Sequence, residues 1–361
     1  MLEQTGMLPL IIKENITESE KQKIISAYSK KTVEDVFGEV KAKKVIPFAA
    51  KTFSEVCLDT EFWKSKLEFY RERNKKILEL LDTVYSTLEK YGVKKMFVTE
   101  NFGALLSADG DIGLFASGDV DNCADYSEKQ RIYAGFEELG FERCERFALK
   151  NHIATTFHPH NKEIGEDFYI SVDFHPLARL KLPCFVNADD FIDWDKLYCY
   201  KDTCVKLAPV NSLMYICMLH ISLHSFSRAP DARLYMDIIN LSKLSVDWKL
   251  IMKWAKKDNT KVRLSTSANI ANRLFGVEMP EEVLSLSKRC EKVLKQVYDE
   301  NNRDLIYEPK GLKVLRIEAL CDDNGIISCF IKMAFPDKTW VKQTYGSSSL
   351  VSYIKHIKRI I

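Results

Sequence analysis

Apolar and polar positions along the chain follow two different periods, and the period changes twice. Up to residue 92 the apolar positions recur at helical spacing, with acidic residues on the opposite face. Between residues 93 and 183 short apolar runs of strand length alternate with short helical segments, and from residue 207 the helical period returns. The pattern predicts an α+β protein with a helical region at 1–92, a small mixed-sheet domain at 93–185 and a larger all-α domain at 205–361.

Local signals place the first helices. Thr17-Glu18-Ser19-Glu20 has the form of a capping box, which predicts a helix from there to about Tyr28, and a second short helix begins near Thr32. A longer helix ends at Gly92, which is a plausible left-handed stop. Its buried stripe consists of Ile77, Leu81, Val84, Tyr85 and Leu88.

The middle of the chain reads as strands separated by turns and helices. Strand-like segments fall at 95–98, at the run that contains Asp119 and Asp121, and at 146–150, 153–157 and 168–173. Helices are expected from about Asn101 and over 127–139, the second ended by Gly140.

The last part of the chain is predicted to be helical. Pro209 can open a helix, Asp247 caps another over 248–256, and further helices are expected at 233–240, 259–274 and 281–301. A basic amphipathic helix over 353–359 ends the chain, and we interpret its charged side as a solvated face.

Composition narrows the class of protein. With 361 residues, 46% hydrophobic and 29% charged, the chain is long enough for two or three packed units. No apolar run approaches the roughly 20 residues that a membrane helix needs. The apolar patch at 7–12 is short for a signal sequence, so we expect a cytoplasmic protein with no membrane partner.

Charge and cysteine content add two expectations. The formal net charge of +2 gives no global attraction to nucleic acid, so a nucleic-acid partner is not expected. None of the ten cysteines stands in a Cys-x-x-Cys arrangement, and we expect free buried thiols in a reducing compartment.

The candidate chemistry centres on Gly118-Asp119-Val120-Asp121-Asn122. In an extended segment Asp119 and Asp121 point to the same side, and two adjacent carboxylates need a hard cation, a base or solvent to be tolerable. Asp173, at the end of the apolar run 168–172, would add a third carboxylate from a second strand. The alternative is that Asp119 and Asp121 belong to a strand-end turn on a solvent-exposed edge of the sheet and have no metal-binding role. Two other Asp-x-Asp pairs occur, at 109/111 and 193/195, in a turn and a polar connector.

Histidines offer weaker candidates. His175 is a ligand, a base or a packing residue. His220 and His224 have the helical spacing of a zinc pair, but Ile221 stands where a metalloprotease has Glu, so we interpret them as structural or pocket-lining. We interpret His158-Pro159-His160 as a loop. Elsewhere, Arg233 and Asp237 are spaced for an intrahelical salt bridge, with nucleotide contact as the alternative.

A family resemblance rests on several segments taken together. In the helical half they are 213–220 with His224, 233–238, Asp247-Trp248, and 274–277 with Pro280, and in the sheet region Val172-Asp173-Phe174-His175. These segments resemble the bacterial uncharacterised nucleotidyltransferase family. The order of strands and helices around Asp119 resembles the polymerase-beta-like minimal nucleotidyltransferase fold. The match extends from about Tyr91 to the carboxyl end, and the order and spacing of its motifs are more specific than any one of them.

The resemblance implies an enzyme that transfers a nucleoside monophosphate from a nucleoside triphosphate to an acceptor, by a Mg²⁺-dependent in-line mechanism. Asp119, Asp121 and Asp173 would be catalytic and would hold Mg²⁺, with Mn²⁺ as the alternative ion. Gly118, Thr99, Asn101 and His175 would contact the nucleotide. The acceptor would be a small molecule, a sugar or a ribosomal peptide.

Two departures from the family pattern support a different hypothesis. Where the family has Lys-Gly after the first strand, this chain has Thr99-Glu100, and a glutamate repels a triphosphate. The family's Arg before the acidic pair is replaced by Phe115 or Ala116. A catalytically silent binding or scaffold protein with the same fold is therefore the alternative. A kinase-like phosphotransferase is disfavoured, because no glycine-rich phosphate loop is present.

Overall fold

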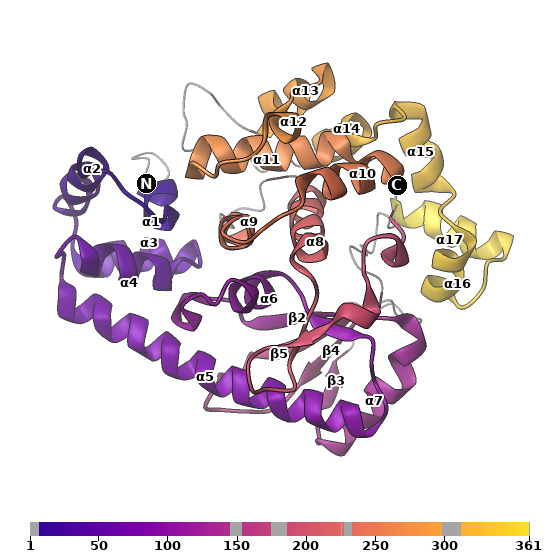
Figure 1. Ribbon diagram of the computed structural model, residues 1–361, viewed down its shortest axis with the longest axis horizontal. Helices are drawn as coiled ribbons and strands as arrows, with labels where there is room; N and C mark the ends of the chain where they lie inside the picture. Colours follow the sequence, from indigo (N-terminus) through magenta and orange to yellow (C-terminus); the bar gives the residue numbers. More distant parts are fainter. Residues whose placement is uncertain are drawn as a thin grey trace.

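The structure is a computed structural model that describes residues 7–144, 154–174, 186–224, 226, 233–297 and 312–360. It confirms the α+β class: a mixed sheet lies between one long helix on its outer side and a larger group of helices on its inner side (Figure 1). The amino-terminal helices and the carboxyl-terminal helices flank this arrangement at opposite ends of the view.

The helices before the sheet are α1 (Met7–Ile12), α2 (Glu18–Tyr28), α3 (Val33–Ala42), α4 (Ile46–Glu55) and α5 (Thr60–Lys90). Two helices lie within the sheet region, α6 (Glu100–Ser107) and α7 (Lys129–Glu138). The later helices are α8 (Val210–Leu223), α9 (Leu234–Leu241), α10 (Trp248–Asp258), α11 (Lys261–Phe275), α12 (Glu281–Leu284), α13 (Lys288–Val297), α14 (Leu312–Cys321), α15 (Ile326–Ala334), α16 (Lys338–Tyr345) and α17 (Leu350–Ile360).

The main sheet has the strand order β1-β2-β5-β4-β3. Its strands are β1 (Met96–Val98), β2 (Asp119–Ala124), β3 (Glu142–Cys144), β4 (Ala154–His158) and β5 (Tyr169–Asp173). β2 and β5 pair in parallel and the other neighbours pair antiparallel. A separate two-stranded ladder joins β6 (Tyr198–Cys199) to β7 (Lys206–Leu207).

The two faces of the sheet have different partners. Val120, Ile170 and Val172 face a core that they share with Ile77 and Leu81 of α5, so the predicted stripe of that helix packs on the sheet. On the other face, Phe97 and Cys123 belong to the core of the helical half. The face that carries the odd-numbered positions of β2 and β5 is therefore covered by helices rather than by bulk solvent.

Local sequence signals explain the element ends that were predicted. Thr17 caps α2 in a complete capping box with Glu20, and Thr32 caps α3 in the same way with Asp35. Gly92 has φ 74°, the left-handed conformation expected after the last turn of α5.

Other predicted elements need correction or lie outside the described residues. The single helix expected over 281–301 is wrong, because α12 ends at Leu284 and a new helix, α13, begins at Lys288. The Ser287 hydroxyl accepts a hydrogen bond from the Cys290 backbone N–H at 3.1 Å, so a side chain caps the restart. Residues 298–301 and the strand expected at 146–150 are outside the described residues.

Two general expectations can be compared with the structure. Every cysteine within the described residues is a free thiol, and five of them are buried: Cys123, Cys217, Cys290, Cys321 and Cys329. Among the described helices, none combines the length and the apolar character needed to cross a lipid bilayer.

Candidate active site

Three of the predicted site residues lie on one face of two adjacent strands. Asp119 and Asp121 are alternate residues of β2, and the parallel register pairs Asp121 with Ser171 and Cys123 with Asp173. Residues paired in this way point to the same side of a sheet, and neighbouring strands are about 4.8 Å apart. Asp173 therefore shares the face of Asp119 and Asp121.

Within the described residues, these carboxylates have no basic partner. Asp119 accepts a hydrogen bond from the Ser117 hydroxyl at 2.6 Å, and across the described residues no ion pair joins Asp119, Asp121 or Asp173 to a lysine, arginine or histidine. The pair at 109/111 behaves differently: Asp109 lies 2.5 Å from the Lys201 ammonium and Asp111 lies 2.6 Å from the Arg71 guanidinium. That second pair is thus neutralised within the fold.

The uncompensated charges shift the titration of the cluster. Burial, together with the charges of Glu100 and Asp119, raises the pKa of Asp173 to about 8. Burial is also the largest cause that raises the pKa of Asp121 well above its ordinary value, and the carboxylates of Asp119 and Glu100 add to it. A cation placed between these groups would oppose both pKa shifts, because an opposite charge favours the ionised carboxylates.

The donor set fits a hard divalent ion, because Mg²⁺ binds through carboxylate oxygens and keeps several water ligands. The three aspartates do not form a preassembled cage, however. In the described part of the chain they are not among the groups of three or more ligand atoms that lie within 4.8 Å of one another. The arrangement suits an ion that is bound partly by substrate phosphates rather than by protein alone.

The start of α6 faces the same cluster and has an unusual backbone. Glu100 has φ 41° and Asn101 has φ 6° and ψ −76°, backbone conformations that residues other than glycine rarely adopt. The Glu100 carboxylate lies 2.7 Å from Nδ1 of His220, and Nε2 of His220 lies 2.8 Å from Nε2 of His224. The two histidines of α8 and its C-cap thus support an acidic side chain, which agrees with a structural or pocket-lining role.

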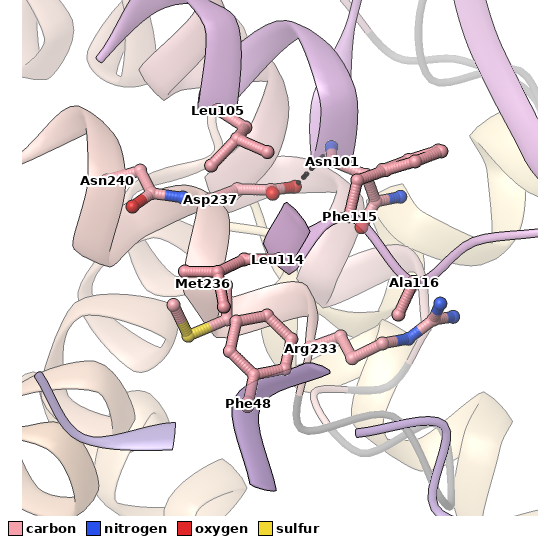
Figure 2. Close-up of a pocket in the computed structure, with 10 residues that line it drawn as sticks. All are labelled: Phe48, Asn101, Leu105, Leu114, Phe115, Ala116, Arg233, Met236, Asp237 and Asn240. Carbon is pink, nitrogen blue, oxygen red and sulfur yellow. Dashed lines mark hydrogen bonds between the residues drawn. The ribbon is translucent and has the colours of Figure 1, made fainter. Parts of the chain in front are cut away.

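One backbone amide in the first turn of α6 already has a carboxylate partner. The Asn101 backbone N–H donates a hydrogen bond to the Asp237 carboxylate at 3.0 Å, as the dashed line in Figure 2 shows. Asp237 is buried on α9. Burial and the charge of Glu100 raise the pKa of Asp237 well above its usual range, although the Asn101 N–H and the charge of Arg233 act in the opposite direction.

A small pocket adjoins this contact. Its walls come from α4, α6, α9 and the segment that leads into β2: Phe48, Asn101, Leu105, Leu114, Phe115, Ala116, Arg233, Met236, Asp237 and Asn240. In Figure 2 the Arg233 side chain extends toward Ala116. The Arg233 guanidinium, at the N-cap of α9, thus lies beside the segment that leads into β2.

The remaining predicted nucleotide contacts have mixed support. Thr99 is buried, and its backbone N–H donates to the Asp121 carbonyl at 2.9 Å, so its main-chain donor is used within the sheet. At Gly118 an added Cβ would meet only the Asp167 carbonyl oxygen at 3.8 Å, an ordinary contact, so the chain itself gives no steric reason for glycine there. His175 lies outside the described residues.

Sequence reasoning missed one group of functional side chains. The loop expected at His158-Pro159-His160 is wrong for its first residue, because His158 ends β4. Among the described residues, candidate ligand atoms of Glu142, His158 and His160 all lie within 4.8 Å of one another. A His-x-His spacing was the available signal, but the third residue comes from β3, which was not predicted.

Comparisons with known proteins give little information about the function of this chain. No protein-family model matches the chain, and no curated protein matches it. Among solved structures, the chain is similar to the antibiotic-resistance factor ANT(2'')-Ia, an aminoglycoside nucleotidyltransferase, with a TM-score of 0.35 and 9% identity over 51% of this chain and 91% of that chain. A likeness this distant carries no argument, so the functional conclusion depends on the site.

Proposed function

We propose that this protein is a Mg²⁺-dependent nucleotidyltransferase, which transfers a nucleoside monophosphate from a nucleoside triphosphate to a small-molecule, sugar or peptide acceptor. The single observation that carries the proposal is the β2/β5 register, which puts Asp119, Asp121 and Asp173 on one helix-covered face. The described structure gives these three carboxylates no basic partner within the protein.

The chemistry assigns a role to each side chain. Asp119 and Asp121 would hold Mg²⁺, and Asp173 would complete the donor set from the neighbouring strand. When bound, the ion supplies charge neutralisation at the phosphoryl oxygens. The Ser117 hydroxyl orients Asp119 through its 2.6 Å hydrogen bond. From the neighbouring strand, Asp173 would also help to orient or deprotonate an acceptor hydroxyl.

One observation favours the alternative of a silent binding or scaffold protein. The amide at the start of α6 is where a triphosphate would find a backbone donor, yet Asp237 occupies it, and Glu100 adds a second negative charge beside it. Under this alternative Asp237 holds an internal contact between α6 and α9, and no nucleotide binds.

Nucleotide binding separates the two functions. The full chain is incubated with each labelled nucleoside triphosphate, with Mg²⁺ or with EDTA, and bound nucleotide and released pyrophosphate are measured. Asp119→Asn and Asp121→Asn are compared with Asp195→Asn, which alters an exposed Asp-x-Asp pair of the same chain.

The enzyme proposal predicts Mg²⁺-dependent binding that both β2 variants lose and Asp195→Asn keeps. Absence of binding for every nucleotide at millimolar concentration would instead support the scaffold. Nucleotide binding that persists in both β2 variants would contradict the assigned site.

A further inference from the structure

A second cluster of ligating side chains lies at the edge of the same sheet. Glu142 on β3 pairs in register with His158 at the end of β4, and His160 follows two residues later. The Nδ1 atoms of His158 and His160 are 2.8 Å apart, and Nε2 of His160 is 2.8 Å from the Glu142 carboxylate. His158 is the most enclosed of the three, whereas Glu142 and His160 are exposed.

Hydrogen bonding fixes the tautomers of both rings. Nε2 of His158 faces the Glu166 backbone carbonyl, which can only accept, so this nitrogen carries the hydrogen. Nε2 of His160 faces the Glu142 carboxylate, so it carries a hydrogen for the same reason. In neutral rings both Nδ1 atoms are then bare, and two lone pairs face each other across 2.8 Å.

That contact is repulsive unless one ring is protonated or a metal cation lies between the rings. The pair on α8 makes the contrast clear: Nδ1 of His220 faces the Glu100 carboxylate, and Nε2 of His220 can accept a hydrogen from Nε2 of His224. One set of neutral tautomers therefore satisfies His220 and His224, whereas no neutral set satisfies His158 and His160.

The geometry of ligation is close to what a metal ion requires. Histidines that bind metals commonly donate their other ring N–H to a carbonyl or carboxylate, and both rings already do so. With Zn–N bonds of about 2.0 Å and tetrahedral angles, two ligating nitrogens are about 3.3 Å apart. The rings need to separate by only a fraction of an ångström, and the exposed His160 side chain can move.

We propose that His158 and His160 form a binding site for Zn²⁺ or a chemically similar divalent ion, with Glu142 as the carboxylate that orients His160. Imidazole nitrogens select this class over Mg²⁺, whose preferred ligands are oxygens. Two protein ligands leave the other coordination positions for water or another group. Through His158 and the Glu142–His160 hydrogen bond, the ion links β4 to β3 and thereby stabilises the edge of the sheet.

The site is separate from the aspartate cluster. Tyr169 pairs in register with Asp119, and the His158 and Tyr169 rings are 5.0 Å apart, so one strand lies between the histidines and β2. At about 4.8 Å per strand the separation from Asp119 is about 10 Å. The proposal therefore does not depend on the proposed nucleotidyltransferase activity.

Metal titration tests the proposal. Protein freed of metal with a chelator is titrated with Zn²⁺ in competition with a chelating dye, and Co²⁺ is added separately to record its visible absorption spectrum. The variants are His158→Ala, His160→Ala and Glu142→Gln. The controls are Glu163→Gln, an exposed residue of the β4–β5 connection that pairs with Lys76, and Asp121→Asn in the aspartate cluster. Circular dichroism of the metal-free variants checks that each folds.

We expect one equivalent of Zn²⁺, a tetrahedral Co²⁺ spectrum, and affinity reduced at least about tenfold in each histidine variant, since even outer-shell changes cost that much. Both controls keep wild-type affinity. Any of three results would overturn the proposed site. They are the absence of Zn²⁺ binding, an unchanged Zn²⁺ affinity in folded His160→Ala, and a thiolate charge-transfer band that shows cysteine ligands. Loss of Zn²⁺ in Asp121→Asn would also overturn it, by moving the ion to the aspartates.

Discussion

Replacing Asp173 with asparagine should stabilise the metal-free protein while removing the proposed nucleotidyltransferase activity. Burial and the charges of Glu100 and Asp119 raise the pKa of Asp173 to about 8, whereas an unfolded aspartate titrates near its ordinary value of 3.8. Between these two values the folded protein holds a proton that the unfolded chain has released. The free energy of unfolding therefore falls as pH rises from about 4 to about 8. Asparagine resembles the protonated side chain and avoids this cost.

The size of the effect follows from the same shift. Each pKa unit corresponds to about 1.4 kcal/mol, and a shift of about four units sets an upper bound of roughly 5–6 kcal/mol. Asp173 is only partly buried and its neighbours titrate with it, so we expect about 1–3 kcal/mol of stabilisation at pH 8. At pH 4 the gain should be small, because the folded side chain is protonated and the unfolded one, near its ordinary pKa of 3.8, is about half protonated.

Urea denaturation at pH 4, 6 and 8 in EDTA measures the effect, with Asp195→Asn as the exposed control. Added Mg²⁺ and nucleoside triphosphate should stabilise the wild type, by about 2.7 kcal/mol at one hundred times the dissociation constant, and should not stabilise Asp173→Asn comparably. The reasoning is refuted if Asp173→Asn destabilises the metal-free protein at pH 8, or if its effect is the same at all three pH values.

Three further changes test other parts of the structure. Gly103→Ala should destabilise by about 1–3 kcal/mol in thermal unfolding, because the new Cβ would lie 2.4 Å from the Val98 carbonyl oxygen; an unchanged melting temperature would contradict the close packing of α6 on β1. Glu318→Ala should lower the free energy of unfolding by about 3–5 kcal/mol, because it leaves the Arg263 guanidinium buried without its partner at 2.5 Å. A variant whose stability stays within about 1 kcal/mol of the wild type would contradict this role of the ion pair. Asp237→Asn removes a charge at the start of α6 and should tighten nucleoside triphosphate binding about three- to tenfold in equilibrium dialysis, whereas weaker binding would argue against a phosphate position there.

Local signals account for the parts of the fold that the sequence predicts. The capping boxes at Thr17 and Thr32 satisfy helix donors within three residues, and the alternation of Asp119 and Asp121 needs only an extended strand. Asp173 was predicted because an apolar strand precedes it directly. Its parallel pairing with β2 then follows once both strands occupy one sheet.

Contacts between distant segments could not be predicted in the same way. The Asn101–Asp237 hydrogen bond joins residues 136 positions apart, and nothing in either segment indicates the other. The cluster at the sheet edge depends on the register of β3 with β4, which brings Glu142 beside His158. The break between α12 and α13 was missed because apolar spacing continues across it, and only the Ser287 cap reveals the restart.

The central claim is that Asp119, Asp121 and Asp173 hold the divalent ions of a nucleotide site. Crystals grown with Mn²⁺ and a non-hydrolysable nucleoside triphosphate analogue test it directly through anomalous scattering. The account predicts an anomalous peak within bonding distance of the Asp119 and Asp121 carboxylates and next to the triphosphate, absent from Asp121→Asn crystals. Binding of the nucleotide and Mn²⁺ at another place in the protein would contradict this site. So would the absence of binding at millimolar concentrations of both.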